Sequence, residues 1–181
     1  IGCSISDLVS GGASIPLVPV VINSPLFEAD KDPNTETLTI ISGNGNGSVE
    51  GERIQALSGT SVSFGNSGAF KTNDVAVFVK KDRPTGCGVT RDLVTGIVPP
   101  VVNLSVGPLG LSSTFAQNDS LFNLGATPSV RVYRVRNQTL TVCDFMVNNC
   151  AAGGSANNPA VWVPIANNIV SLRAQYGRDT D

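Results

Sequence analysis

A serine at the centre of residues 65–69 is this sequence's nearest approach to a catalytic motif. The stretch "GNSGA" comes close to the nucleophile elbow of serine hydrolases, but Ala69 stands where the last glycine of that motif belongs. The chain has no histidine, so it lacks the usual general base and every Ser-His or Cys-His system that activates a nucleophile. The sequence therefore favours an ordinary turn at Ser67 and predicts no enzyme.

Glycines alternate with asparagines at residues 43–47, a pattern that can cradle phosphate groups. Phosphate loops continue into a helix and close with Lys followed by Ser or Thr. The stretch "GNGNG" has neither feature and is flanked by strand-like sequence. Because Asn-Gly pairs tolerate positive φ in tight hairpins, we expect a hairpin turn at 42–47 and no cofactor.

Carboxylates supply the remaining candidate chemistry. Two are enough for a glycosidase, but only 6% of the residues are aromatic, with one Trp, so platforms for sugar stacking are scarce. Glu28, Asp30 and Asp32 surround a proline turn, where we expect a solvated loop. Asp179 and Asp181 in the terminal "DTD" are a weak calcium-loop candidate, because oxygen ligands at alternate positions open many such loops. Nothing follows to complete a site, so we expect a polar tail and no metal.

Three arginines lie around Tyr133, a pattern that can contact a phosphate backbone. Side chains alternate between the two faces of a strand, so Arg131 faces away from Arg134 and Arg136, and no single basic stripe forms. The net charge is −2 and the pI is about 5.0, which argues against nucleic acid or an anionic membrane surface as a partner. We expect a solvated face at these arginines.

Four cysteines indicate disulfides rather than a zinc site, because no CxxC pair and no histidine accompanies them. Cys143 and Cys150 enclose the short loop "DFMVNN", so we pair them with each other and pair Cys3 with Cys87. Disulfides imply the periplasm, the cell surface or the secreted space. Four buried free thiols in a cytosolic protein are the alternative.

The elements that must position these residues are mostly strands separated by frequent turns. We expect strands or extended segments at 15–23, 36–41, 52–57, 60–64, 74–81 and 88–98, a long connection at 99–119, and a hairpin over 129–146 that turns near Asn137. A short helical turn at 164–168 should lead into a closing strand, because an antiparallel sheet needs a partner at its edge. With 181 residues, 41% of them hydrophobic, the chain fits one domain over residues 1–181.

Taken together, these blocks resemble the PilW family of type IV pilus minor pilins, which are related to the minor pseudopilins of type II secretion. The resemblance runs in order through "IGC", "ETLTI", "FKTNDVAVFVKKDRPTGCGVT" and "VYRVRNQTLTVC". Its most specific block is "IANNIVSLRAQYGRDTD" at the C-terminal end. The matching positions in that block are Asn168, Ile169, Val170, Leu172, Gln175, Tyr176, Gly177 and Asp179.

The resemblance implies an α+β, predominantly antiparallel β fold, namely a pilin-like globular head lacking its N-terminal hydrophobic helix. It implies a non-enzymatic structural role in priming type IV pilus assembly and a place at the filament tip. The expected partners are other minor pilins, the assembly machinery and a tip adhesin. The expected location is a periplasmic head anchored in the inner membrane through a helix preceding Ile1, and then the extracellular pilus.

Two other functional classes remain open. One is a secreted β-rich carbohydrate-binding or adhesive module, and the other is a histidine-free hydrolase that uses carboxylates. A prepilin leader and a hydrophobic helix upstream of Ile1 would favour the pilin hypothesis over both. We expect the head by itself to be monomeric or only weakly associated.

Overall fold

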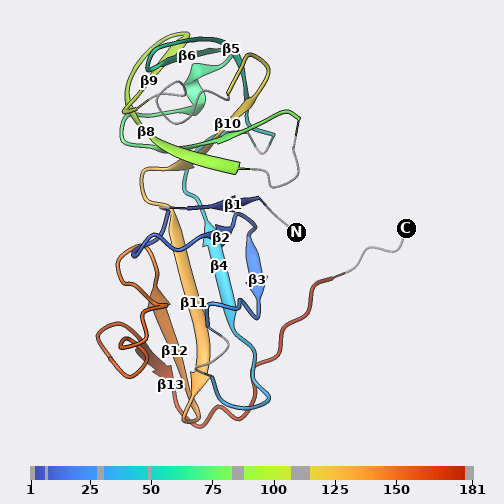
Figure 1. Ribbon diagram of the computed structural model, residues 1–181, viewed down its shortest axis with the longest axis vertical. Coiled ribbons are helices and arrows are strands. Elements are labelled where there is room, and N and C mark those ends of the chain that lie inside the picture. Colours follow the sequence, from blue (N-terminus) through green and yellow to red (C-terminus); the bar gives the residue numbers. More distant parts are fainter. Residues whose placement is uncertain are drawn as a thin grey trace. The chain divides into compact units, whose positions relative to one another are not determined.

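The structure, a computed structural model, describes residues 3–6, 8–27, 31–48, 50–82, 88–106 and 115–177. The regular structure of these residues is essentially all β, and their only helical element is the short 3-10 turn η2 (Ser67–Ala69) (Figure 1). The α+β class is therefore wrong. The physical reason is that apolar residues recur mostly in short alternating runs cut by Gly, Pro and Asn, a pattern typical of strands. Within the described ranges, no helix has the length and apolar character needed to cross a membrane.

Contacts divide the chain into two compact units. One unit holds residues 1–8, 14–17 and 42–128, and the other holds residues 9–13, 18–41 and 129–181. The single domain expected over residues 1–181 stays a prediction, because a division by contacts does not measure whether the units fold independently.

The first unit is built around a closed antiparallel barrel. Its strands are β1 (Ser4–Ile5), β2 (Ile15–Pro16), β5 (Glu52–Ser58), β6 (Ser61–Phe64), β7 (Val75–Val79), β8 (Gly88–Val98), β9 (Val101–Leu104) and β10 (Ser120–Gly125). Six strands close in the order β8-β7-β10-β5-β6-β9, because β9 pairs with β8 as well as with β6. The last strand, β10, lies beside β7 after the β7-β8-β9 meander, which is a Greek-key arrangement. Strand β1 extends the sheet by pairing in parallel with β8.

Alternation along the strands explains the interior of this barrel. In β6, Val62 and Phe64 are fully buried, while Ser61 and Ser63, which alternate with them, are half-exposed. Phe64 stacks on Phe70 with ring centroids 5.3 Å apart. The buried core consists of Ile54, Val62, Phe64, Ala69, Phe70, Ala76, Phe78, Val94, Val102, Leu104, Phe115 and Leu121. A closed barrel leaves none of its six strands with an unpaired edge.

The second unit contains a five-stranded sheet in the order β13-β12-β11-β4-β3. Its strands are β3 (Val20–Ile22), β4 (Leu38–Ser42), β11 (Ser129–Arg136), β12 (Thr139–Asp144) and β13 (Val163–Ala166). The β11–β12 hairpin turns at Asn137 and Gln138, whose φ values of 48° and 57° are both positive, as a two-residue type I′ turn requires. The predicted hairpin over 129–146 is confirmed.

The hairpin predicted at 42–47 is wrong, because β4 and β5 belong to different sheets. The glycines there serve close packing instead. The amide N–H of Asn44 donates to the carbonyl of Leu124 on β10 at 2.9 Å. A Cβ atom at Gly43 would lie 2.7 Å from that same carbonyl oxygen, so only glycine lets the loop approach β10 this closely.

Two further predictions about elements are wrong. The helical turn expected at 164–168 is replaced by β13, which pairs with β12 and ends at Ala166. The chain then runs to residue 177 without regular secondary structure instead of forming a strand. The connection expected over 99–119 contains β9, because Val101–Leu104 pairs with strands on both of its sides.

Candidate functional site

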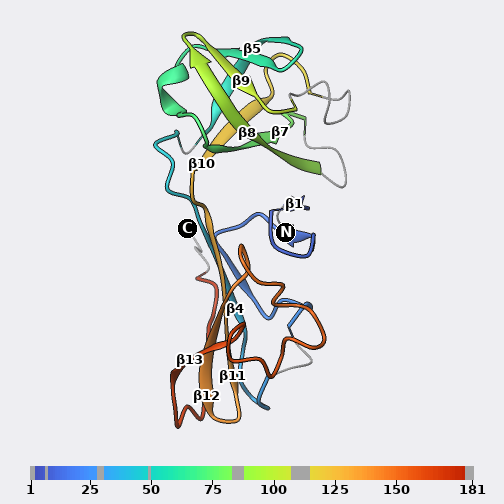
Figure 2. The ribbon, with the colours of Figure 1, turned by 90° about the vertical axis from the view of Figure 1, so that its left-hand side faces the viewer.

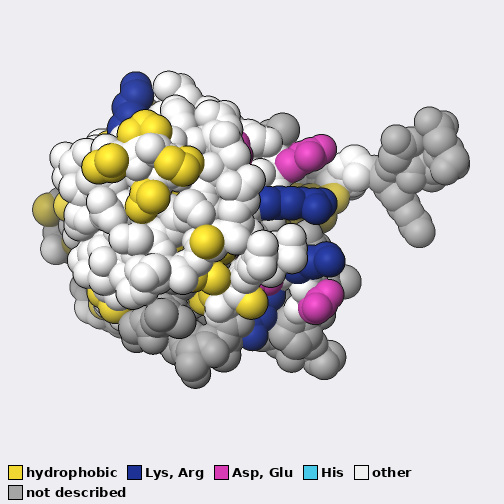
Figure 3. All heavy atoms as spheres, turned by 90° about the horizontal axis from the view of Figure 1, so that it is seen from above, with side chains coloured by type: hydrophobic (Ala, Val, Ile, Leu, Met, Phe, Trp, Pro, Cys, Tyr) yellow, Lys and Arg dark blue, Asp and Glu magenta, His cyan; other side chains and the backbone are white. Residues whose placement is uncertain are grey.

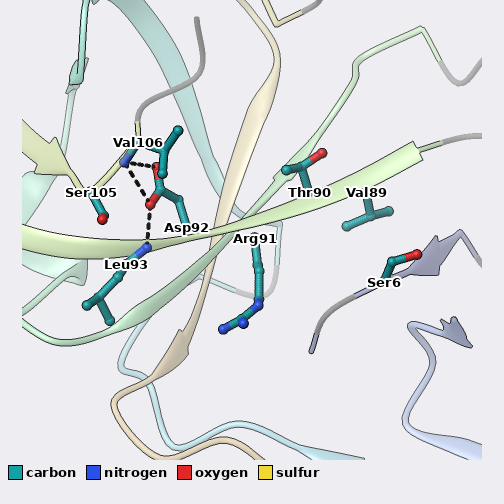
Figure 4. A pocket seen from close by; sticks show the side chains of 8 residues that line it. All are labelled: Ser6, Val89, Thr90, Arg91, Asp92, Leu93, Ser105 and Val106. Atoms are coloured by element: carbon teal, nitrogen blue, oxygen red, sulfur yellow. Dashed lines mark hydrogen bonds between the residues drawn. The ribbon is translucent and has the colours of Figure 1, made fainter. Parts of the chain in front are cut away.

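A hollow of about 480 Å³ in the barrel unit lies beside β8 (Figure 4). It is lined by Ser6, Val89, Thr90, Arg91, Asp92, Leu93, Ser105 and Val106. Arg91 and Asp92 leave opposite sides of the strand (Figure 4), as neighbours in a strand must. The carboxylate of Asp92 accepts the N–H groups of Leu93 at 2.7 Å and of Val106 at 3.2 Å. This aspartate therefore anchors the backbone just after β9 through hydrogen bonds to main-chain N–H groups.

Two more buried aspartates of this unit have the same kind of structural role. Asp74 accepts the N–H of Lys71 at 2.8 Å and the side-chain amide of Asn123 at 2.7 Å. Asp119 accepts the N–H of Lys81 at 2.9 Å and that of Ala116 at 2.8 Å. A carboxylate engaged by backbone N–H groups stabilises a loop. These contacts give no support to the acid–base pair that a histidine-free hydrolase needs.

Neither sequence motif forms a site. Ser67 begins the 3-10 turn η2 and is only 6% exposed, and its carbonyl accepts the N–H of Phe70 at 3.2 Å. The predicted turn at Ser67 is confirmed. In the "GNGNG" loop the N–H of Asn44 donates to the carbonyl of Leu124. That loop is a packing element and not a phosphate cradle.

The second unit has a smaller hollow of about 200 Å³ between β11 and the 156–164 segment. The side chain of Arg134, 1% exposed, forms one wall. Its guanidinium carbon lies 3.6 Å from the centre of the Trp162 ring, and its Nη2 donates to the carbonyl of Ala156 at 3.0 Å. Trp162 and Phe145 each make an edge-to-face contact with Phe27. Arg134 is thus part of the packed interior of this unit.

The prediction for the arginines is partly wrong. Arg131 is exposed and Arg136 half-buried, and Arg131 does lie on the face opposite to Arg134 and Arg136. The expectation of a solvated face is wrong for Arg134, which is buried against Trp162. Alternation assigns a side chain to a face, but it does not reveal that a loop from 150–162 covers that face. The structure therefore offers no basic stripe for nucleic acid on β11.

The acidic candidates lie partly outside the described residues. Asp179 and Asp181, the weak calcium-loop candidate, are outside them, as are Glu28 and Asp30. Asp32 accepts the N–H groups of the hairpin turn at Asn137 and Gln138, at 2.8 and 2.7 Å, so it supports that turn instead of lying free in solvent. No group of three or more Cys, Asp or Glu side chains within the described ranges could hold a metal ion.

One predicted disulfide is confirmed. Cys143 and Cys150 are bonded, with Cα atoms 6.0 Å apart, and both are buried. The bridge fixes the loop that follows β12. That loop begins with Phe145, which contacts Phe27. Cys3 takes part in a disulfide, but Cys87 lies outside the described residues, and the Cys3–Cys87 pairing stays a prediction.

The C-terminal segment, residues 167–177, is attached to the sheet of the second unit by contacts that sequence analysis did not identify. It runs beside the sheet (Figure 2). The N–H of Glu36 donates to the carbonyl of Leu172 at 3.0 Å, and the N–H of Ala174 donates to the Glu36 carboxylate. The hydroxyl of Tyr176 accepts the N–H of Ile22 at 2.8 Å and donates to the carbonyl of Val20 at 3.4 Å. These hydrogen bonds join residues 136 or more positions apart in sequence, because Leu172 lies 172 − 36 = 136 positions after Glu36, and no local pattern reveals such contacts.

Comparisons with protein-family models, with curated proteins and with solved structures find no match to this chain.

Proposed function

We propose that this chain is the non-enzymatic head of a type IV pilus minor pilin that takes part in priming pilus assembly and sits at the filament tip. The proposal rests on the matching sequence blocks and not on the fold, since the expected α+β class is contradicted. The observation that carries it is the placement of the most specific block: residues 167–177, where the family-like positions are densest, form hydrogen bonds to β3, to Glu36 and to the β11–β12 turn.

Individual matched positions in this block have clear structural reasons. Asn168 has a φ of 61°, in the left-handed region that asparagine tolerates better than most residues. The N–H of Ile169 donates to the carbonyl of Gln138 at the β11–β12 turn, at 2.8 Å. Leu172 and Tyr176 make the contacts to Glu36 and to β3 described above. A family pattern that specifies a closing structural segment fits a scaffold protein better than an enzyme.

The chemistry of the interior supports the same role. Asp74, Asp92 and Asp119 are buried and bind backbone N–H groups. In the hollow beside β8, the Asp92 carboxylate accepts backbone N–H groups. The Cys143–Cys150 bridge is the kind of stabilisation that proteins use in oxidising compartments. Each feature suits a structural head that works outside the cytoplasm.

A surface for neighbouring subunits is available on the barrel unit. Apolar side chains gather on one part of the face seen in Figure 3. The tip of the β8–β9 hairpin is a run of four apolar residues, Val98 to Val101, in which Val98 is 67% exposed and both prolines are exposed. Runs of exposed apolar residues are unfavourable in water unless another molecule covers them.

The test is to mix this head with the soluble heads of the co-encoded minor pilins and to measure mass by light scattering. We expect a transient heteromeric complex with an interface below about 1,200 Å². Val98→Asp should weaken it, because a charge would have to be desolvated at the contact. Val147→Asp is the matched control, since Val147 is 73% exposed in the other unit.

Two results would overturn the proposal. One is the absence of binding to every minor pilin head together with clear affinity for a glycan, which would favour the adhesive module. The other is turnover of an ester, glycoside or phosphoester that is lost when a single carboxylate or serine is changed.

A further inference from the structure

Strand β3 forms one edge of the five-stranded sheet, and two of its residues point their backbone groups away from the sheet. The N–H of Ile41 donates to the carbonyl of Pro19, and the N–H of Asn23 donates to the carbonyl of Thr37. Hydrogen-bonded pairs alternate with non-bonded pairs along an antiparallel ladder. In this register Val20 and Ile22 are therefore the non-bonded positions, and their N–H and C=O groups face outward.

One phenol covers this edge. Tyr176 takes the outward N–H of Ile22 and the outward carbonyl of Val20 with a single hydroxyl group. Tyr176 as a whole residue is 64% exposed, and Val170 in the same segment is 81% exposed. A contact made by an exposed segment without regular structure opens at low cost compared with a packed strand. The edge is thus masked by one side chain at the end of a segment whose other hydrogen bonds, among the described residues, are made to Glu36 and to the β11–β12 hairpin and not to β3.

We propose that β3 is a self-pairing edge: when the C-terminal segment releases it, the β3 strand of a second copy of this chain adds to it in antiparallel orientation. A two-fold axis at Val21 places Val20 of each copy opposite Ile22 of the other copy, which gives two equivalent pairs. Each such pair exchanges two hydrogen bonds between outward-facing groups. The edge is therefore complementary to itself, and a homodimer extends one sheet across both copies.

The side chains around the edge suit an identical partner. Val20 lies opposite Ile40 on β4, and they are 38% and 39% exposed. Ile22 lies opposite Leu38 on the same face, and both are half-exposed. Neither β3 nor β4 contains a charged residue, so two copies meet without repulsion between like charges. Natural edge strands commonly avoid such pairing with lysines, and this edge carries none.

The experiment compares the wild-type chain with Tyr176→Phe and Tyr176→Ala by sedimentation velocity across a concentration series. Hydrogen exchange at the Ile22 amide is measured on the same samples. Wild type should be monomeric or weakly associated. Both variants should dimerise at least about tenfold more tightly, a factor that corresponds to about 1.4 kcal/mol. In dilute samples of the variants, the Ile22 amide should exchange about tenfold faster than in wild type.

Two controls make the result decisive. Tyr133→Phe removes the other tyrosine hydroxyl of the chain, from β11, and should leave the association unchanged. Val20→Lys placed in the Tyr176→Ala background puts like charges across the two-fold axis and should restore the monomer. Unaltered mass and unaltered Ile22 exchange in both Tyr176 variants would overturn the proposal. A dimer that survives Val20→Lys would overturn it as well, because another surface would then be responsible.

Discussion

Replacing Arg134 by alanine should destabilise the second unit by about 3.5–5 kcal/mol, the sum of a buried cation–π contact and a charge-assisted hydrogen bond. The guanidinium lies 3.6 Å from the Trp162 ring centre in a buried site, where a cation–π contact contributes about 2 kcal/mol. Its hydrogen bond to the carbonyl of Ala156 is charge-assisted and contributes about 1.5–3 kcal/mol. Arg134→Lys keeps the charge but loses the planar stacking, so we expect a loss of about 1–3 kcal/mol.

The assay is urea unfolding followed by tryptophan fluorescence. Trp162 is the only tryptophan of the chain, so the signal reports on the unit that contains Arg134. The unfolding midpoint should fall while the slope with urea stays constant, which identifies a change in stability. Arg131→Ala, on the exposed face of the same strand, is the matched control and should change stability by no more than about 0.5 kcal/mol. The argument fails if Arg134→Ala lowers the unfolding midpoint no more than Arg131→Ala does.

Three further outcomes follow from the structure. Cys143→Ser combined with Cys150→Ser removes a bridge that closes a loop of sequence separation 7. By the chain-entropy argument the free energy of unfolding should fall by about 2.5 kcal/mol. The same urea assay measures this, and an unchanged midpoint would contradict it. Peptide mapping of the non-reduced protein should find Cys3 joined to Cys87, a longer closure that contributes about 4 kcal/mol, and Cys3 joined to another cysteine would refute the pairing. Gly43→Ala should lower the free energy of unfolding by about 1–3 kcal/mol, because its Cβ would lie 2.7 Å from the carbonyl oxygen and 3.1 Å from the Cα of Leu124. Gly153→Ala is the control, because nothing lies within 4 Å of its Cβ. Thermal melts should show a lower melting temperature for Gly43→Ala and no change for Gly153→Ala.

Features that depend on neighbouring residues in sequence could be predicted. The hairpin over 129–146 follows from two alternating runs around a turn that asparagine favours, and the structure turns there at Asn137 and Gln138. The Cys143–Cys150 bridge follows from the short loop between them. In both cases the partners are close in sequence, so bringing them together costs little chain entropy. The local pattern is then enough to predict the contact.

Features that depend on distant partners could not be predicted. The "GNGNG" glycines have the composition of a hairpin turn, but their role is set by β10, which lies far along the sequence and approaches closely. Arg134 alternates like a surface residue, and only the covering loop makes it a buried one. The closure of the barrel depends on β9 pairing on both sides, and the family resemblance led to an α+β class instead. Tertiary context overrode the local pattern at each of these positions.

The most direct test of the proposed function is a count of surface pili on cells that lack the gene for this protein. If the protein primes pilus assembly, electron microscopy should show that pili are lost or strongly reduced in the deletion strain. Re-expression of the full-length natural gene should restore them, and a gene with Val98→Asp should restore fewer than one with Val147→Asp. Wild-type numbers of pili on the deletion strain, with normal pilus function, would contradict the account.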